Sequence, residues 1–129
     1  MDQAQAKQLT DLILGAAFRV HTELGPGLLE SAYKACLVYE LQKAGLQVET
    51  EVPVPMIYDQ TQLLDVGYRI DILVEKEVVL EIKAVEALAP VHGAQLVSYL
   101  KLAKRRVGLL INFNVVHLKD GIRRRVNGL

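Results

Sequence analysis

Residues 78–85 of the chain read VVLEIKAV, and this stretch decides the fold. Apart from Glu81 and Lys83 it is a run of aliphatic residues, the pattern of a strand that is buried on both faces. Side chains two positions apart in a strand point to the same face, so the two charges lie side by side. Because burying an ionised group costs several kcal/mol unless it is paired or binds a metal, this strand indicates a functional site.

The preceding apolar strand carries a second carboxylate, Asp71. Two apolar strands joined by the three charged residues Glu75–Glu77 predict an antiparallel hairpin. A three-residue connection pairs Val74 with Val78 and turns Asp71 to the face of Glu81, whereas a two-residue turn would place it on the other face. We predict the three-residue connection, or a bulge with the same effect.

Hydrophobic periodicity divides the rest of the chain into helices and strands. Apolar residues recur at helical spacing in some segments and alternate in others. The order is helix, helix, three strands, helix, strand and a C-terminal β-hairpin, which favours an α/β (α+β) fold with a mixed sheet flanked by helices. The predicted helices are residues 3–21, 28–44 and 89–104; the predicted strands are 48–58, 67–74, 78–85 and 107–113, with 115–118 and 122–126 forming the hairpin.

Length and composition predict a single domain over residues 1–129. The chain is 51% hydrophobic and 23% charged, which is enough for one compact core. Its formal net charge is +0, so any affinity for nucleic acid must come from a local patch. The single Cys36 suits a reducing compartment, and no apolar run approaches the length of a membrane span. We expect a soluble, cytoplasmic protein that does not associate with membranes.

Asp71, Glu81 and Lys83 together predict a metal site. Two adjacent carboxylates repel each other, and one lysine cannot neutralise both. A hard divalent cation such as Mg²⁺ relieves the repulsion, because it takes oxygen ligands and needs only one or two carboxylates. The carbonyl oxygen of Ile82 is a further candidate ligand. Such an ion beside a lysine suits the hydrolysis of a phosphodiester.

Four short motifs, in order, resemble those of the PD-(D/E)XK nuclease superfamily. Asp71 with Glu81-Ile82-Lys83 resembles its active-site signature. Gly27-Leu28-Leu29-Glu30-Ser31-Ala32-Tyr33 resembles the motif of the small GxxExxY family within it, and Gln95-Leu96-Val97-Ser98-Tyr99 resembles the QxxxY motif of RecB-type nucleases. E-x-K alone is common by chance, and the ordered set makes the resemblance specific.

This resemblance covers nearly the whole chain. It implies a restriction-endonuclease-like core, with residues 1–129 as one nuclease-like domain. It also implies cleavage of nucleic acid, expected to be DNA, with Mg²⁺ or Mn²⁺ as cofactor. The chain departs from the superfamily at Ile70, where the superfamily's name has Pro. Since one small domain offers limited grip on a duplex, we expect a homodimer or a subunit of a larger assembly.

The resemblance also implies a role for each matching residue. Lys83 would orient or activate water and offset charge on the phosphate. Gln95 and Tyr99, one helical turn apart, would orient Lys83 and contact a backbone phosphate. The ion would be held by Asp71, Glu81, the backbone oxygen of Ile82, and Glu30.

Each of these features also has a structural interpretation. Glu81 and Lys83 could form an ion pair on an edge strand, and Glu30 could be an acidic residue favoured at a helix N-terminus. Gln95 and Tyr99 could lie on a solvated helix face.

Two questions therefore stay open in the sequence. Basic clusters at residues 101–106 and 123–125 are either solvated charge or, if they flank the site, contacts to a phosphate backbone. The alternative function is a catalytically silent nuclease-fold domain that binds nucleic acid or protein. The intact set of Asp71, Glu81 and Lys83 argues against that decay.

Overall fold

The structure, a computed structural model, describes all 129 residues. Its central sheet has five strands in the order β1-β2-β3-β4-β5, in which only β3 and β4 run parallel. The helices are α1 (Gln3–Leu24), α2 (Glu30–Lys43) and α3 (Pro90–Ala103), with a short 3-10 helix at Leu118–Gly121; the strands are β1 (Val48–Tyr58), β2 (Thr61–Val74), β3 (Val78–Lys83), β4 (Val107–Asn112) and β5 (Ile122–Val126).

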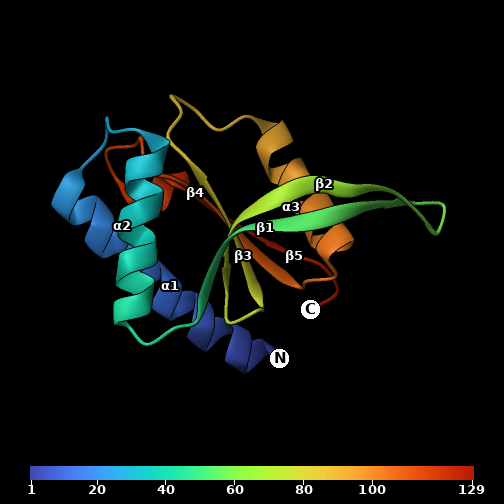
Figure 1. Cartoon of the computed structure of the whole chain (residues 1–129). Coiled ribbons are helices and arrows are strands. Elements are labelled where there is room, and N and C mark those ends of the chain that lie inside the picture. The colour runs from blue at the N-terminus through green and yellow to red at the C-terminus, as the bar shows by residue number, and fades with distance from the viewer.

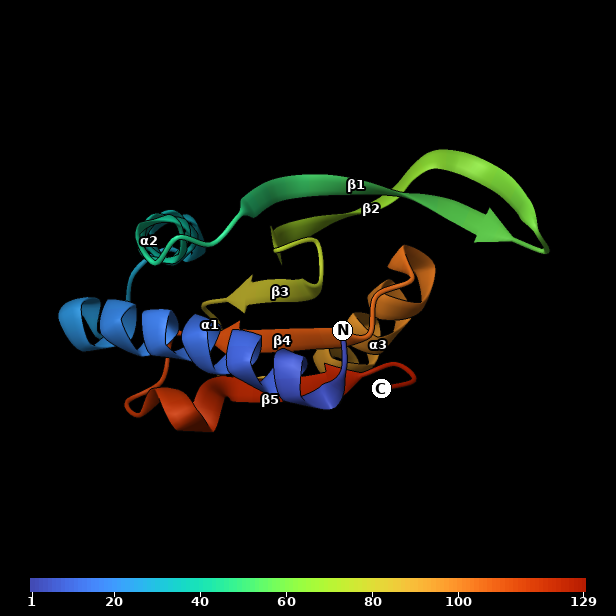
Figure 2. The same ribbon diagram turned by 90° about the horizontal axis from the view of Figure 1, so that it is seen from below.

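The helices cover both faces of the sheet. Helices α1 and α2 lie on one face, where their apolar residues form a core with Leu80 and Ile82 of β3. Helix α3 lies on the other face and packs on a second core that includes Val79 of β3 and Leu110 of β4. Figures 1 and 2 show this arrangement, with the long β1–β2 hairpin reaching beyond the other strands and over α3. Strand β3 therefore lies between two apolar layers, as its composition predicts.

The register of the β2–β3 hairpin is confirmed as predicted. Val74 pairs with Val78, and Ile72 pairs with Leu80, so Glu75–Glu77 form a three-residue connection. Glu75 and the next residue take left-handed backbone conformations, with φ of 53° and 57°, which closes the turn without a glycine. The site therefore depends on a register that the turn fixes.

Tyr33 ties the loop after α1 to the end of β4. Its hydroxyl donates to the carbonyl oxygen of Gly25 at 2.6 Å and accepts from the backbone N–H of Leu28 at 3.0 Å. Its ring stacks on Phe113, with centroids 4.8 Å apart. The backbone N–H of Phe113 in turn donates to the carbonyl oxygen of Lys83. These contacts position the start of α2 relative to the end of β3.

The predicted C-terminal hairpin is wrong. Residues 115–118 form no strand; Leu118 is buried and begins the 3-10 helix. Strand β5 pairs with β4 instead, antiparallel, from Ile111↔Ile122 to Val107↔Val126. The chain does turn near Gly121, as the sequence indicates. Because Leu118 is buried, this turn is part of the 3-10 helix, which returns the chain to the sheet.

The other element boundaries differ by smaller amounts. The first helix continues to Leu24, the second begins at Glu30, and the third strand ends at Lys83. The second strand begins at Thr61, earlier than predicted, because its exposed outer half pairs only with β1. None of the helices has the length and hydrophobicity that a membrane span requires.

Candidate active site

Asp71 and Glu81 meet where β2 and β3 separate. The ladder between these strands stops at Ile72↔Leu80, so the next two residues, Asp71 and Glu81, follow the last pair. One oxygen of the Asp71 carboxylate accepts a hydrogen bond from the backbone N–H of Ile82 at 2.9 Å. A side-chain acceptor thus replaces the lost ladder contact and holds the carboxylate against β3.

Glu81 is buried and incompletely hydrogen-bonded. Only 8% of its surface is exposed, and its Oε1 atom is buried without a hydrogen-bond partner. Burial, followed by the negative charge of Asp71, raises the pKa of Glu81 from 4.5 to about 8, while Lys83 acts in the opposite direction. An acid with a raised pKa and an unpaired oxygen is a feature of functional sites rather than of stable cores.

Lys83 lies two residues further along β3, on the same face as Glu81. The structure contains three ion pairs, and none of them includes Glu81 or Lys83. The structure therefore contains no ion pair between Glu81 and Lys83. The ammonium group of Lys83 remains available to an anion.

Asn112 is a site residue that the sequence analysis missed. It is 1% exposed and lies beside Lys83 in the parallel β3–β4 ladder. Its side-chain amide donates to the carbonyl oxygen of Val85 and accepts from the N–H of Val85, both at 3.0 Å. These two bonds fix the loop that follows Lys83. A polar residue at the end of the apolar stretch 107–113 was the available signal.

Tyr99 lies near the carboxylates and contacts Tyr68, a second residue that the sequence analysis missed. Burial, then the charges of Glu81 and Asp71, raises the pKa of the Tyr99 hydroxyl. The ring of Tyr68, on β2, stacks on Tyr99 with centroids 4.0 Å apart, and its hydroxyl donates to the backbone oxygen of Tyr99. Burial and the charge of Glu81 also raise the pKa of Tyr68. The sequence signal for Tyr68 was its place in an apolar strand, three residues before Asp71.

Gln95 and Glu30 stand apart from this group. Gln95 lies one turn before Tyr99 on α3, exposed and without a hydrogen bond from its side chain. Glu30 is the first residue of α2, exposed, and its side chain forms no ion pair. No group of three or more His, Cys, Asp or Glu residues could hold a metal ion, so the structure does not bring Glu30 to Asp71 and Glu81. Its predicted role as a ligand stays a prediction.

The donor set at Asp71 and Glu81 nevertheless fits a divalent metal. Both supply carboxylate oxygens, the ligands that Mg²⁺ prefers, and the unpaired Oε1 of Glu81 is a buried acceptor without a donor. A cation there would remove the repulsion that raises the pKa of Glu81. Ile82 lies between Glu81 and Lys83 with its side chain in the α1–α2 core; the role of its backbone oxygen stays a prediction.

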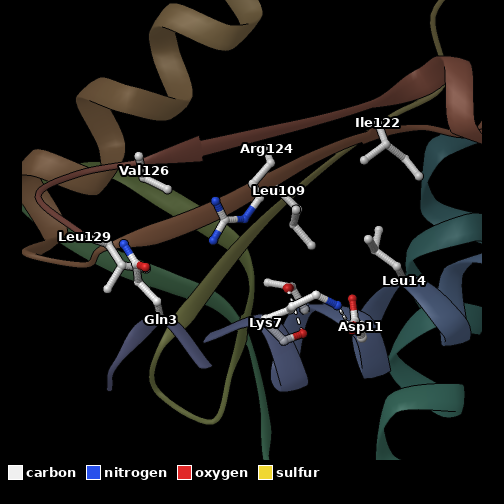
Figure 3. Close-up of a pocket in the computed structure, with 10 residues that line it drawn as sticks. Gln3, Lys7, Asp11, Leu14, Leu109, Ile122, Arg124, Val126 and Leu129 are labelled. Carbon is white, nitrogen blue, oxygen red and sulfur yellow. Dashed lines mark hydrogen bonds and ion pairs between the residues drawn. The ribbon is translucent and has the colours of Figure 1, made fainter. Parts of the chain in front are cut away.

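A large surface cavity lies elsewhere. It has a volume of about 590 Å³ and opens between α1 and β5, where Lys7, Asp11 and Arg124 line it (Figure 3). None of the predicted site residues contributes to it. Glu81 pairs with Leu110, which lies in the core beneath α3, so the predicted site is on the α3 face of the sheet. This cavity is on the α1 face.

Comparison with known families agrees with the fold. A family model described as the PD-(D/E)XK nuclease superfamily matches residues 7–125. The chain therefore belongs to the PD-(D/E)XK nuclease superfamily. Its five-stranded mixed sheet with flanking helices is consistent with the restriction-endonuclease-like fold of that superfamily. No curated protein and no solved structure matches the chain.

Membership defines the class of chemistry. Nucleases of this superfamily act on nucleic acid and generally use divalent metals. Asp71 and the Glu81-Ile82-Lys83 segment occupy the hairpin strands β2 and β3 of the sheet.

Proposed function

We propose that this protein is a Mg²⁺- or Mn²⁺-dependent nuclease that hydrolyses phosphodiester bonds of DNA. The observation that carries the proposal is the Asp71–Glu81 pair, in which a buried carboxylate with an unpaired oxygen lies beside a second carboxylate. Membership of the nuclease superfamily supports the reaction class.

In this proposal the ion is held by Asp71, Glu81 and the backbone oxygen of Ile82. When bound, it would supply Lewis-acid stabilisation of charge on the scissile phosphate and a more acidic water. The other groups belong to the chain itself. Lys83 offsets the negative charge that develops on the phosphate. Gln95 and Tyr99 orient Lys83 and contact a neighbouring phosphate of the backbone.

We also place the chain in the GxxExxY family. Gly27 supports this placement, because its φ of +100° is a conformation that other residues rarely adopt. Tyr33 supports it as well, since its hydroxyl closes the loop at Gly25 and Leu28. Glu30 lies between these two anchors. It stands apart from Asp71 and Glu81 in this structure, and we propose that it approaches the ion from the start of α2 once the ion is bound.

The proposal includes a homodimer or larger assembly in the cytoplasm. One compact domain presents little surface to a duplex, and a second copy would double it. Size-exclusion chromatography with light scattering tests this part: a monomer at all concentrations, with and without DNA, contradicts the dimer.

A cleavage assay tests the activity directly. The purified protein is incubated with single-stranded, duplex and branched DNA in Mg²⁺ or Mn²⁺, and Lys83→Ala is compared with Lys43→Ala, which removes an exposed lysine from the last turn of α2. We expect cleavage that requires metal, persists in Lys43→Ala and is lost in Lys83→Ala. Cleavage that survives in Lys83→Ala contradicts the assigned site.

A melting experiment separates the nuclease from the silent-domain alternative. A ligand that binds only the folded state stabilises it by about 2.7 kcal/mol at a hundredfold excess over Kd. We expect Mn²⁺ to raise the melting temperature of the wild type, but not that of an Asp71→Asn variant. Absence of any metal-dependent shift argues for the silent domain.

A further inference from the structure

A second concave site lies beside the first turn of α3. This cavity has a volume of about 190 Å³ and is lined by Pro90 and Gly93 of α3, Leu110 of β4, and Arg123 and Arg125 of β5. No acidic residue lines it, and neither arginine forms an ion pair. Two guanidinium groups thus meet in one cavity without a carboxylate to neutralise them.

The alternation of β5 divides its three successive arginines between two faces. Arg123 pairs with Leu110, which lies in the core beneath α3. Arg124 pairs with Leu109, which lies in the core beneath α1. Figure 3 shows Arg124 in the large cavity on that face. Only Arg123 and Arg125 therefore share a face with Asp71 and Glu81.

Gly93 makes room for one of the guanidinium groups. A Cβ atom at this position would lie 2.8 Å from Nη2 of Arg125, closer than real Cβ atoms approach such an atom. Glycine is unfavourable in a helix, yet here it is buried in the first turn of α3. Its missing side chain lets Arg125 lie against the helix.

Both guanidinium groups are oriented by backbone oxygens and keep free N–H donors. Nη1 of Arg123 donates to the carbonyl oxygens of Asp120 and Ile122, at 3.0 and 2.9 Å. Nη1 of Arg125 donates to the carbonyl oxygen of Arg124 at 2.9 Å. Each guanidinium has five N–H donors in a planar fork that suits a phosphate, and a helix N-terminus favours an anion.

We propose that Arg123 and Arg125 bind a phosphate of the nucleic-acid backbone outside the scissile position. This inference rests on the proposed nuclease function and names how the substrate is held. Glu81, Leu110 and Arg123 are neighbours on consecutive strands, so Arg123 lies about 10 Å from Glu81 along the sheet. Along a duplex axis, where one strand rises roughly 3.4 Å per nucleotide, that separation corresponds to about three nucleotides.

The test measures the salt dependence of DNA binding with cleavage switched off. A labelled duplex of about 20 base pairs is titrated in EDTA over a range of salt concentrations, because each phosphate contact contributes about 0.9 to the slope of log K against log[salt]. Arg123→Gln is compared with Arg124→Gln, which removes the same charge from the adjacent, exposed position of β5. Gly93→Ala is the third variant, because it displaces Arg125 without changing any charge.

We expect Arg123→Gln and Gly93→Ala each to lower the slope by about 0.9, and Arg124→Gln to leave it unchanged. Loss of one contact should therefore weaken binding, relative to the wild type, roughly eightfold more at about 0.1 M salt than at about 1 M salt. Melting curves check that each variant folds; both arginines of the comparison are exposed, so neither should lower the melting temperature.

Equal losses in Arg123→Gln and Arg124→Gln would overturn the inference, since they would reflect net charge alone. So would a wild type that does not bind the duplex. The proposed function fails separately: a wild type that cleaves DNA while Arg123→Gln and Gly93→Ala keep the full slope refutes only the phosphate site. If the wild type never cleaves DNA but the slope is lower in those two variants, the phosphate site is supported and the nuclease function is refuted.

Discussion

Replacing Glu81 with glutamine should stabilise the metal-free protein. The pKa of Glu81 is about 8 in the folded chain and its ordinary value is 4.5, so the carboxylate is harder to ionise when folded. The two pKa values, about 8 and 4.5, differ by about 3.5. Since one pKa unit corresponds to about 1.4 kcal/mol, this difference amounts to roughly 5 kcal/mol. This is the upper limit of the cost of the ionised side chain. Glutamine keeps the shape and carries no charge.

The sign of the pH dependence follows from proton binding. Between pH 4.5 and about 8 the folded state holds a proton on Glu81 that the unfolded state has released. The stability contributed by this group is therefore fully present below pH 4.5 and is lost as the pH rises through about 8. The slope is about −1.4 kcal/mol per pH unit in that window. Glu81→Gln should lack this component, and at pH 7 it should gain up to roughly 3 kcal/mol.

Urea denaturation in EDTA measures this difference. Wild type and Glu81→Gln are compared at about pH 5 and about pH 8, with Glu77→Gln, in the connection just before β3, as a control that removes a partly exposed carboxylate. The gain should be about 1 kcal/mol or less at the lower pH and several kcal/mol at the higher. A buried ion pair behaves oppositely, since breaking one costs roughly 3–5 kcal/mol. Destabilisation of that size in Glu81→Gln would refute the reasoning.

Three other variants test separate parts of the site. Lys83→Ala should abolish cleavage while leaving the free energy of unfolding of the metal-free protein, measured in urea, within about 0.5 kcal/mol of wild type, because Lys83 has no ion-pair partner. Tyr68→Phe should cost about 1 kcal/mol in urea denaturation, since it removes the hydrogen bond to Tyr99 and keeps the stacked ring; no loss would mean that this bond contributes nothing. Asn112→Leu should cost roughly 2–4 kcal/mol, because it leaves the N–H and the carbonyl of Val85 without partners, and a smaller loss would mean that water replaces them.

The centre of the fold was predictable because charge and register constrain each other. The three-residue connection between the two apolar strands places Asp71 on the face of Glu81, and the structure has that connection. The periodic segments that became α1, α2 and α3 were predictable for the same physical reason, since each buries one apolar stripe. Where a buried face fixed the pattern, the sequence was sufficient.

The sequence-based predictions fail where a segment is short and the residues that it contacts lie far along the chain. Residues 115–118 are mostly apolar and precede a turn signal, as a hairpin strand would, but Leu118 is buried in the α1–α2 core and the segment turns instead. Asn112 was missed because its importance comes from Val85, with which it pairs only through the parallel β3–β4 crossover. The separation of Arg123 from Arg124 requires knowing that β5 pairs with β4, which the predicted hairpin did not include.

Helix α3 connects the two parts of the candidate site. It approaches β4 closely at Gly108, where a Cβ atom would lie 2.8 Å from the side chain of Leu96. This contact sets the height of the helix above the sheet. From that position Tyr99 lies near the carboxylates on one side, and Gly93 accommodates Arg125 on the other. Under the proposed function, the spacing of β3, β4 and β5 sets the distance between the scissile phosphate and the phosphate at Arg123, while α3 positions Tyr99 and Arg125. A nucleic acid with a different phosphate spacing would therefore engage only one part of the site at a time.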